Sequence, residues 1–158
     1  MRFASPIALF CLSVSTAPLV AGESPPVLRI SGQLANAPVT LSLADLKAMP
    51  VTTLETDTVV TDGMHRFTGV LMRDLLENLE AEGDIVTATA LNDYIVDIPM
   101  TDFEDFDVIV AYAMDGAALD RADKGPLWIV YPRENHTELQ DIRYDYRWVW
   151  QLSQLDVR

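Results

Sequence analysis

The sequence has almost no cysteine, few basic residues and no long apolar run after its first twenty residues. Its single cysteine, Cys11, lies close to the N-terminus, so the rest of the 158 residues offers no thiolate for a disulfide, a nucleophile or a metal ligand. The chain has 11 Lys and Arg against 24 Asp and Glu, a net charge of −13. Nucleic acids and anionic membranes bind basic surfaces, so we expect no nucleic-acid partner.

The first 22 residues have the pattern of a secretory signal peptide. Arg2 gives a positive start, residues 7–20 form a mostly apolar run, and Ala21 and Gly22 supply small residues for cleavage. The run is shorter than the ~20 apolar residues that a membrane-spanning helix needs. We therefore predict an exported, periplasmic protein without direct membrane insertion, with a signal peptide at 1–22 and one domain at 23–158.

After the signal peptide, short strand-like and helix-like segments follow one another without strict alternation. Ser42 is placed to cap a short helix that ends at Pro50, and leucines spaced along 71–82 predict a second helix with Gly83 as its C-cap. Strands are predicted at 27–30, 39–41, 51–60, 67–70, 85–91, 94–98, 108–114, 127–131 and 152–157. This order predicts an α+β fold, a single domain with a mixed β-sheet or barrel and short helices.

A turn, a charged loop and a buried strand follow one another over residues 115–132. Asp115 and Gly116 favour a tight turn, and the loop 120–124 carries charges of both signs. The apolar run at 127–131 is bounded by proline at both ends, which predicts a short buried strand. The loop before it is either an ordinary surface connection or a place to hold a small polar ligand.

The sequence gives little support for a self-sufficient catalytic centre. A Gly-x-Ser-x-Gly nucleophile motif and Gly-rich phosphate loops are absent. The two histidines, His65 and His136, lie far apart in polar loops and have no ligand partner at i+2 or i+4, apart from the weak pair of His136 and Glu138. Binding residues at turns are the stronger signal, above all the amide, carboxylate and phenol of residues 92–94.

Several segments, in their order, resemble the molybdopterin-binding domain of the sulfite-oxidase family. They are Leu-Ser-Leu-Ala-Asp-Leu at 41–46, Phe-Thr-Gly-Val-Leu-Met-Arg-Asp-Leu-Leu at 67–76, Ala-Leu-Asn-Asp-Tyr at 90–94, Lys-Gly-Pro at 124–126 and Trp-Gln-Leu at 150–152. The resemblance implies a pterin-binding cleft, with molybdenum held by the cofactor and by one cysteine between the first helix and the Phe-x-Gly-Val stretch. Residues 52–63 of this chain contain no cysteine.

A pterin-binding fold without the metal ligand looks like the periplasmic, pterin-responsive branch of this family. That resemblance implies a sensor or adaptor that binds a reduced, metal-free pterin. It also implies a protein partner, the periplasmic domain of a membrane-bound cyclic-di-GMP signalling enzyme. Two alternatives stay open: a molybdopterin-dependent oxidoreductase that lacks the usual cysteine ligand, and a ligand-free protein-interaction module.

The chemistry of a pterin assigns roles to particular side chains. Its flat ring stacks on aromatic faces, and its amino-pyrimidinone edge offers two parallel donors that one carboxylate can accept. We predict Asp93 as that carboxylate, with Asp62 as the alternative. The other candidates are Tyr94 and Trp128 for the aromatic wall, Asn92 and Arg121 for the carbonyl side, Lys124 for a polar tail and Thr61 for the pyrazine edge.

Overall fold

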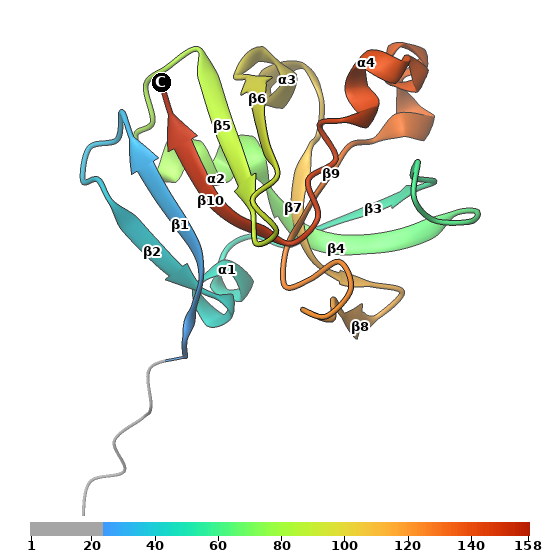
Figure 1. The fold of residues 1–158 in the computed structure, drawn as a ribbon, viewed down its shortest axis with the longest axis horizontal. Coiled ribbons are helices and arrows are strands. Elements are labelled where there is room, and N and C mark those ends of the chain that lie inside the picture. The colour runs from blue at the N-terminus through green and yellow to red at the C-terminus, as the bar shows by residue number, and fades with distance from the viewer. Residues whose placement is uncertain (1–23) are drawn as a thin grey trace, which may run out of the picture.

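A computed structural model of the protein describes residues 24–158 (Figure 1). The predicted signal peptide lies outside the described residues. Within the described part, no helix is both long enough and apolar enough to cross a bilayer. The same part of the chain folds into two β-sheets and a few short helices, which confirms the predicted α+β class.

The first sheet joins strands from both ends of the described chain. Its strands, in spatial order, are β2 (Val39–Ser42), β1 (Pro26–Gly32), β10 (Leu152–Val157), β5 (Ile85–Ala90) and β6 (Ile95–Pro99). β1 and β10 run parallel, whereas the other neighbours are antiparallel. Alternate residues of β5 (Val86, Ala88 and Ala90) are buried, because side chains of a strand point to opposite faces.

The second sheet contains the other five strands. They are β3 (Thr52–Thr56), β4 (His65–Leu71), β7 (Ile109–Met114), β8 (Ala117–Ala118) and β9 (Trp128–Val130), with β7 pairing β4, β8 and β9. β9 is the short buried strand predicted at 127–131, and the turn predicted at Asp115 and Gly116 joins β7 to β8. A Cβ on Gly69 of β4 would lie 2.1 Å from the Val110 carbonyl oxygen of β7, so the close pairing of these strands requires glycine.

The helices are short, and the start of one and the end of another can be compared with the sequence predictions. They are α1 (Leu43–Ala48), α2 (Met72–Asn78), α3 (Thr101–Asp105) and α4 (Ile142–Asp145), with 3₁₀ turns at Arg133–Asn135 and Thr137–Gln140. The predicted cap of α1 is confirmed, since the Ser42 hydroxyl accepts the Asp45 amide and the Asp45 carboxylate accepts the Ser42 amide.

The predicted end of the second helix is wrong. α2 ends at Asn78, and Glu80 adopts a positive φ of 50° while the Ala81 amide donates to the Leu76 carbonyl at 3.0 Å. Gly83 has a different role, because a Cβ there would lie 2.6 Å from the Arg158 carbonyl oxygen. This glycine therefore allows a close backbone contact rather than capping the helix.

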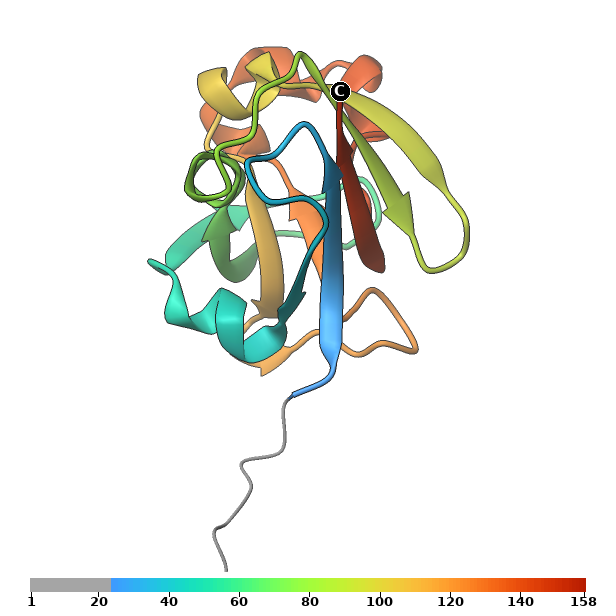
Figure 2. The same cartoon turned by 90° about the vertical axis from the view of Figure 1, so that its left-hand side faces the viewer.

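Figures 1 and 2 show the two sheets from two sides, and buried side chains from both sheets form one hydrophobic core. Trp128 and Trp148 are the largest fully buried side chains, and the Trp128 ring meets the Phe67 ring edge to face at 5.3 Å. A β-bridge pairs Trp128 with Trp150, and the Ile129 amide donates to the Val149 carbonyl. The chain is thus fixed to the second sheet immediately before β10 enters the first.

Candidate functional site

A pocket of about 220 Å³ opens where three segments meet. The loop 57–64 between β3 and β4 contributes two valines, the β5–β6 hairpin contributes two polar residues, and the segment at the end of α4 and after it contributes four. The residues that line the pocket are Val59, Val60, Asn92, Tyr94, Asp145, Tyr146, Trp148 and Trp150. Four aromatic side chains on a small pocket give broad, flat apolar surfaces.

The hairpin turn fixes the positions of Asn92 and Tyr94. The Asn92 side-chain oxygen accepts the Tyr94 amide at 3.1 Å, and the Ala90 amide donates to the Tyr94 carbonyl at 2.9 Å. The Tyr94 hydroxyl then donates to the Tyr146 carbonyl at 2.7 Å, which joins the hairpin to the opposite wall. Burial, followed by the charge of Tyr146, raises the pKa of Tyr94, so its hydroxyl keeps its proton at neutral pH.

A buried charged network supports that opposite wall. Arg147 Nη1 donates to Asp102 Oδ2 at 2.5 Å, and the Tyr131 hydroxyl donates to the same oxygen at 2.8 Å. The Arg147 guanidinium lies over the rings of Tyr144 and Tyr146, 4.7 Å and 5.6 Å from their centroids. Burial, the largest single effect, lowers the pKa of Arg147. Hydrogen bonds to Asp102 and Tyr146, together with the charges of Asp102 and Tyr131, outweigh it, so the net shift of this pKa is upward. This network holds Tyr146 at the pocket.

Two residues that line the pocket each have one buried side-chain atom without a hydrogen-bond partner. These atoms are Asp145 Oδ1 and Trp148 Nε1. Arg133 lies beside the first, with its Nη1 3.9 Å from Asp145 Oδ1, and its Nε is 4.0 Å from Asp57 Oδ1, which also lacks a partner. These distances are too long for hydrogen bonds. The positive charge of Arg133 therefore attracts both carboxylates but gives neither oxygen a hydrogen bond.

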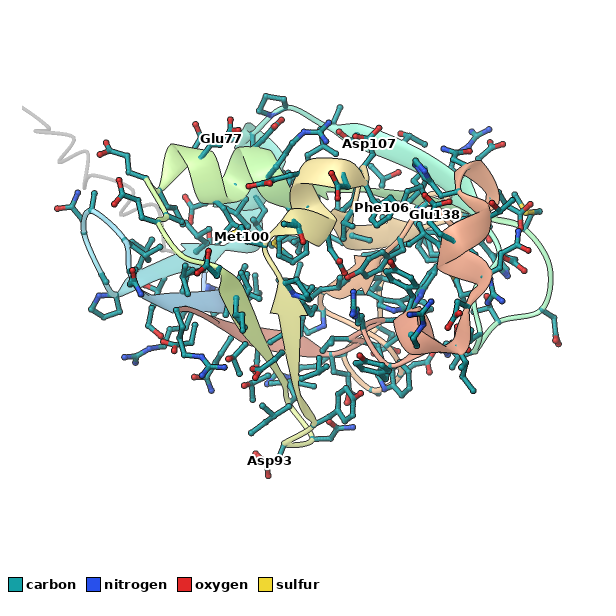
Figure 3. The ribbon with its side chains drawn as sticks, turned by 90° about the horizontal axis from the view of Figure 1, so that it is seen from above. Glu77, Asp93, Met100, Phe106, Asp107 and Glu138 are labelled. Atoms are coloured by element: carbon teal, nitrogen blue, oxygen red, sulfur yellow. The ribbon has the colours of Figure 1, made fainter. Side chains whose placement is uncertain are left out.

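Two of the eight sequence-predicted site residues, Asn92 and Tyr94, line the pocket. Asp93 lies between them in the chain but takes a positive φ of 64°, and Figure 3 shows its carboxylate at the tip of the hairpin, directed away from the molecule. The turn geometry that places its neighbours therefore separates Asp93 from them.

Thr61 and Asp62 belong to the loop that supplies the two pocket valines, but they do not line the pocket themselves. The Thr61 hydroxyl is hydrogen-bonded to that of Thr58 at 2.7 Å. Asp62 is exposed, and its carbonyl oxygen lies 3.1 Å from His65 Nε2. The other ring nitrogen of His65 lies 2.7 Å from Asp115 Oδ2, so the histidine joins this loop to the β7–β8 turn. Sequence reasoning missed that link because the partners are 50 residues apart.

The remaining three predicted residues lie elsewhere. Arg121 is exposed and lines a separate groove with Arg29 on the first sheet, while its carbonyl accepts Gln151 Nε2. Lys124 pairs with the neighbouring carboxylate of Asp123 at 2.9 Å. Trp128 is fully buried in the core, so no face of its ring is open to a ligand.

Sequence reasoning also missed the residues of the last segment, 145–150. The available signal was the density of aromatic rings there, because tyrosines and tryptophans alternate with other residues over only seven positions. Asp141 lies just before this segment, and its side chain accepts a hydrogen bond from the Arg143 amide at 2.9 Å. This bond caps α4, the helix that leads into residues 145–150.

The family model described as the oxidoreductase molybdopterin-binding domain matches residues 24–137. The chain belongs to this family. The match confirms the resemblance to sulfite-oxidase-type molybdopterin domains that the sequence suggested. It ends before Asp145, so half of the pocket lining comes from residues after the matched range. Among curated proteins, none matches the sequence.

A similar solved structure is that of the sulfane dehydrogenase SoxCD from Paracoccus pantotrophus. It superposes with a TM-score of 0.63 and 20% sequence identity over 82% of this chain. The match covers 37% of the SoxCD chain, so most of that protein has no counterpart here. At this level of identity the likeness shows a shared fold.

The pocket fits the ring of the family's cofactor better than it fits the metal. Its aromatic walls suit a flat heterocycle, and among its lining residues Asp145 alone carries a charge. No cysteine follows Cys11, so the pocket offers no thiolate. Across residues 24–158, no three His, Cys, Asp or Glu side chains lie together in a way that could hold a metal ion.

Proposed function

We propose that the protein is a periplasmic pterin-binding sensor or adaptor without catalytic activity, and that it binds a reduced pterin free of metal. The observation that carries this proposal is an aromatic-walled pocket in a molybdopterin-family chain whose domain has no cysteine. Periplasmic location rests on the predicted signal peptide.

Pocket size supports a compact ligand. Sites for drug-sized ligands usually measure about 300–1,000 Å³. This pocket, at about 220 Å³, lies below that range. A two-ring heterocycle suits such a volume better than a ring that carries a metal and a phosphate tail. The absence of a cationic side chain from the lining agrees with a ligand whose bound part is uncharged.

The proposal includes a protein partner, the periplasmic domain of a membrane-bound cyclic-di-GMP signalling enzyme. Support comes from the rim of the pocket, where large apolar side chains are exposed. Val59, Val60, Tyr94 and Tyr146 line the pocket and each remains at least 39% exposed. Clustered apolar residues at one site are typical of an interaction surface, so a partner that covers this rim would contact the ligand as well.

Mass spectrometry of small molecules tests the ligand. The protein is purified from a periplasmic extract and denatured, and the released molecules and the molybdenum content are measured. We expect close to one pterin per protein and no stoichiometric molybdenum. Tyr146→Ala should lose the pterin because it removes a pocket wall, whereas Ile142→Ala, which removes an exposed side chain outside the pocket lining, should keep it. An empty parent protein that also refuses added pterins would refute the proposal.

A second candidate function, a molybdopterin-dependent oxidoreductase, is favoured by the family match itself. Such an enzyme would need another ligand in place of the cysteine thiolate, for example a carboxylate. Stoichiometric molybdenum in protein from its native host would support this function over the first.

A further inference from the structure

The loop that supplies Val59 and Val60 to the pocket is followed directly by His65, the first residue of β4. We infer that a second proton on the His65 ring fixes the end of this loop, so that the pocket wall is ordered in mildly acidic solution and looser above neutral pH. The ordering is a property of the ligand-free protein, whereas its effect on ligand affinity rests on the proposed function.

Both ring nitrogens of His65 face oxygen atoms that accept hydrogen bonds and cannot donate them. Nδ1 lies 2.7 Å from Asp115 Oδ2, and Nε2 lies 3.1 Å from the Asp62 carbonyl oxygen. Hydrogen bonds from the Arg66 amide and then from His65 lower the pKa of Asp115, so its carboxylate stays ionised in mild acid. A neutral imidazole has one donor and one acceptor nitrogen and can satisfy only one of these oxygens, whereas the imidazolium satisfies both.

The carboxylate decides which contact is lost when the ring is neutral. Asp115 Oδ1 accepts the Arg66 amide at 2.9 Å, which leaves Oδ2 for His65 Nδ1. Because the charged acceptor forms the stronger hydrogen bond, the single proton of a neutral His65 stays on Nδ1. Nε2 then presents a lone pair to the Asp62 carbonyl oxygen, and two acceptor atoms at this distance repel each other. The contact between the loop and the histidine is therefore lost.

Hydrogen bonds inside the loop transmit this loss toward the pocket. The Thr58 and Thr61 hydroxyls lie 2.7 Å apart, and the Val60 amide donates to Thr58 Oγ1 at 3.2 Å. These bonds join the pocket valine to the residue next to Asp62, and they contain no group that titrates near neutral pH. The turn that carries Val60 therefore moves together with the end of the loop that His65 holds.

The other charges around His65 do not titrate near neutral pH. Glu55 on the neighbouring strand β3 pairs with Arg66, with Oε1 2.8 Å from Nη2. Within residues 24–158, Asp115 is the one carboxylate at ion-pair distance from His65. Histidine is the side chain whose charge ordinarily changes between about pH 5 and 8, so His65 is the group through which pH acts on this loop.

Hydrogen–deuterium exchange of the ligand-free protein at pH 6 and pH 8 tests the inference. The exchange of residues 57–64 is divided by that of the unfolded chain at the same pH, and the buried strand β7 reports any change in global stability. We expect protection of the loop to be about three- to tenfold greater at pH 6, the ratio that one net hydrogen bond supplies. Equal protection at the two pH values would overturn the inference.

Two substitutions should abolish the pH response in opposite ways. His65→Gln removes the ionisable ring, so the loop should show the parent's low pH 8 protection at both pH values. In Asp115→Asn, the side-chain oxygen still accepts the Arg66 amide, and the new amide nitrogen faces His65 Nδ1. Neutral His65 can then accept that N–H and donate from Nε2 to the Asp62 carbonyl. This variant should therefore keep the high protection at pH 8.

His136→Gln is the matched control. His136 lies outside the loop, and its Nδ1 is 3.9 Å from Glu138 Oε1, too far for a hydrogen bond. This variant should keep the parent's response to pH, and its loss would assign the response to the other histidine and overturn the inference. Circular dichroism checks that each variant is folded. If His65→Gln does not fold, the parent and Asp115→Asn still decide the question.

Pterin binding, followed by quenching of tryptophan fluorescence at the same two pH values, tests the link to the pocket. Titration of the ligand itself is common to all the proteins, so the affinity of the parent is divided by that of Asp115→Asn. We expect this ratio to be about three- to tenfold higher at pH 6 than at pH 8. A constant ratio would overturn the link between loop and pocket. A loop that responds to pH in a protein that binds no pterin would refute the proposed function and leave the pH response standing.

Discussion

Replacing Asp102 by asparagine should destabilise the protein far more than neutralising a surface aspartate. The carboxylate accepts hydrogen bonds from both Arg147 and Tyr131, and the side chains of Asp102 and Arg147 are 7% and 15% exposed. Removing one charge of a buried pair leaves the other uncompensated and costs about 3–5 kcal/mol. Asparagine keeps one acceptor oxygen for Tyr131, so we expect a loss of about 3 kcal/mol, at the lower end of that range.

Urea unfolding at pH 7 measures this difference, with the slope m compared between variants to check two-state behaviour. Asp141→Asn is the control, because Asp141 pairs with Arg143 where the side chains are 40% and 77% exposed. Such an exposed pair contributes little to stability, and Asp141→Asn also weakens a capping hydrogen bond, so the control should lose much less stability than Asp102→Asn. If Asp102→Asn costs no more than Asp141→Asn, the buried network does not hold the pocket wall as argued.

Three further predictions concern other parts of the fold. Burial, followed by the charge of Asp102, raises the pKa of Tyr131, so the free energy of unfolding should fall above about pH 10, where this tyrosine ionises only in the unfolded chain. Tyr131→Phe should lessen that fall, measured as the difference between the urea midpoints at pH 9 and pH 11. Hydrogen bonds from the Arg66 amide and then from His65 lower the pKa of Asp115 from 3.8, so its contribution to stability is present above pH 3.8 and is lost as the pH falls through the lower pKa of the folded state. Asp115→Asn should therefore reduce the loss of stability in acid. An unchanged dependence of stability on acid pH would contradict the assignment. Gly69→Ala should cost about 3 kcal/mol of stability, because the new Cβ would meet the backbone of β7. Gly63→Ala is the control, because nothing lies within 4 Å of a Cβ there and only the positive φ opposes alanine. Equal losses of stability in thermal unfolding would argue against the close β4–β7 contact.

Local chemistry explains which parts of the fold the sequence predicted. The Ser42 cap and the proline-bounded strand β9 depend on neighbouring residues, and both were predicted correctly. The end of α2 was not, because Gly83 is needed for a contact with Arg158, 75 positions later in the chain. Long-range backbone contacts of this kind leave no local pattern, and a glycine after a helical stretch resembles a C-cap whether or not it is one.

The same distinction applies to the site. Asn92 and Tyr94 could be identified because a hairpin turn exposes its residues, but which of them face a pocket depends on segments far away in the chain. Asp93 was predicted as the carboxylate because it lies between Asn92 and Tyr94 at the hairpin turn and a pterin edge suits a carboxylate. The structure gives it a positive φ and places its side chain at the tip of the hairpin, directed outward. Asp145 had no distinguishing neighbour in sequence, since its place in the pocket lining and its proximity to Arg133 depend on segments that are distant in the chain.

The position of β10 between β1 and β5 has a consequence for the order of folding. A growing polypeptide that has not reached residue 152 contains two separate hairpins, β1–β2 and β5–β6, with no strand to join them. Contacts between distant parts of a chain form late, because closing a long loop costs entropy before any pairing is gained. The sheet is therefore completed by insertion of its central strand. Because Trp148 and Trp150 directly precede that strand, the pocket forms in the same step, and a nascent chain that ends before them lacks this pocket.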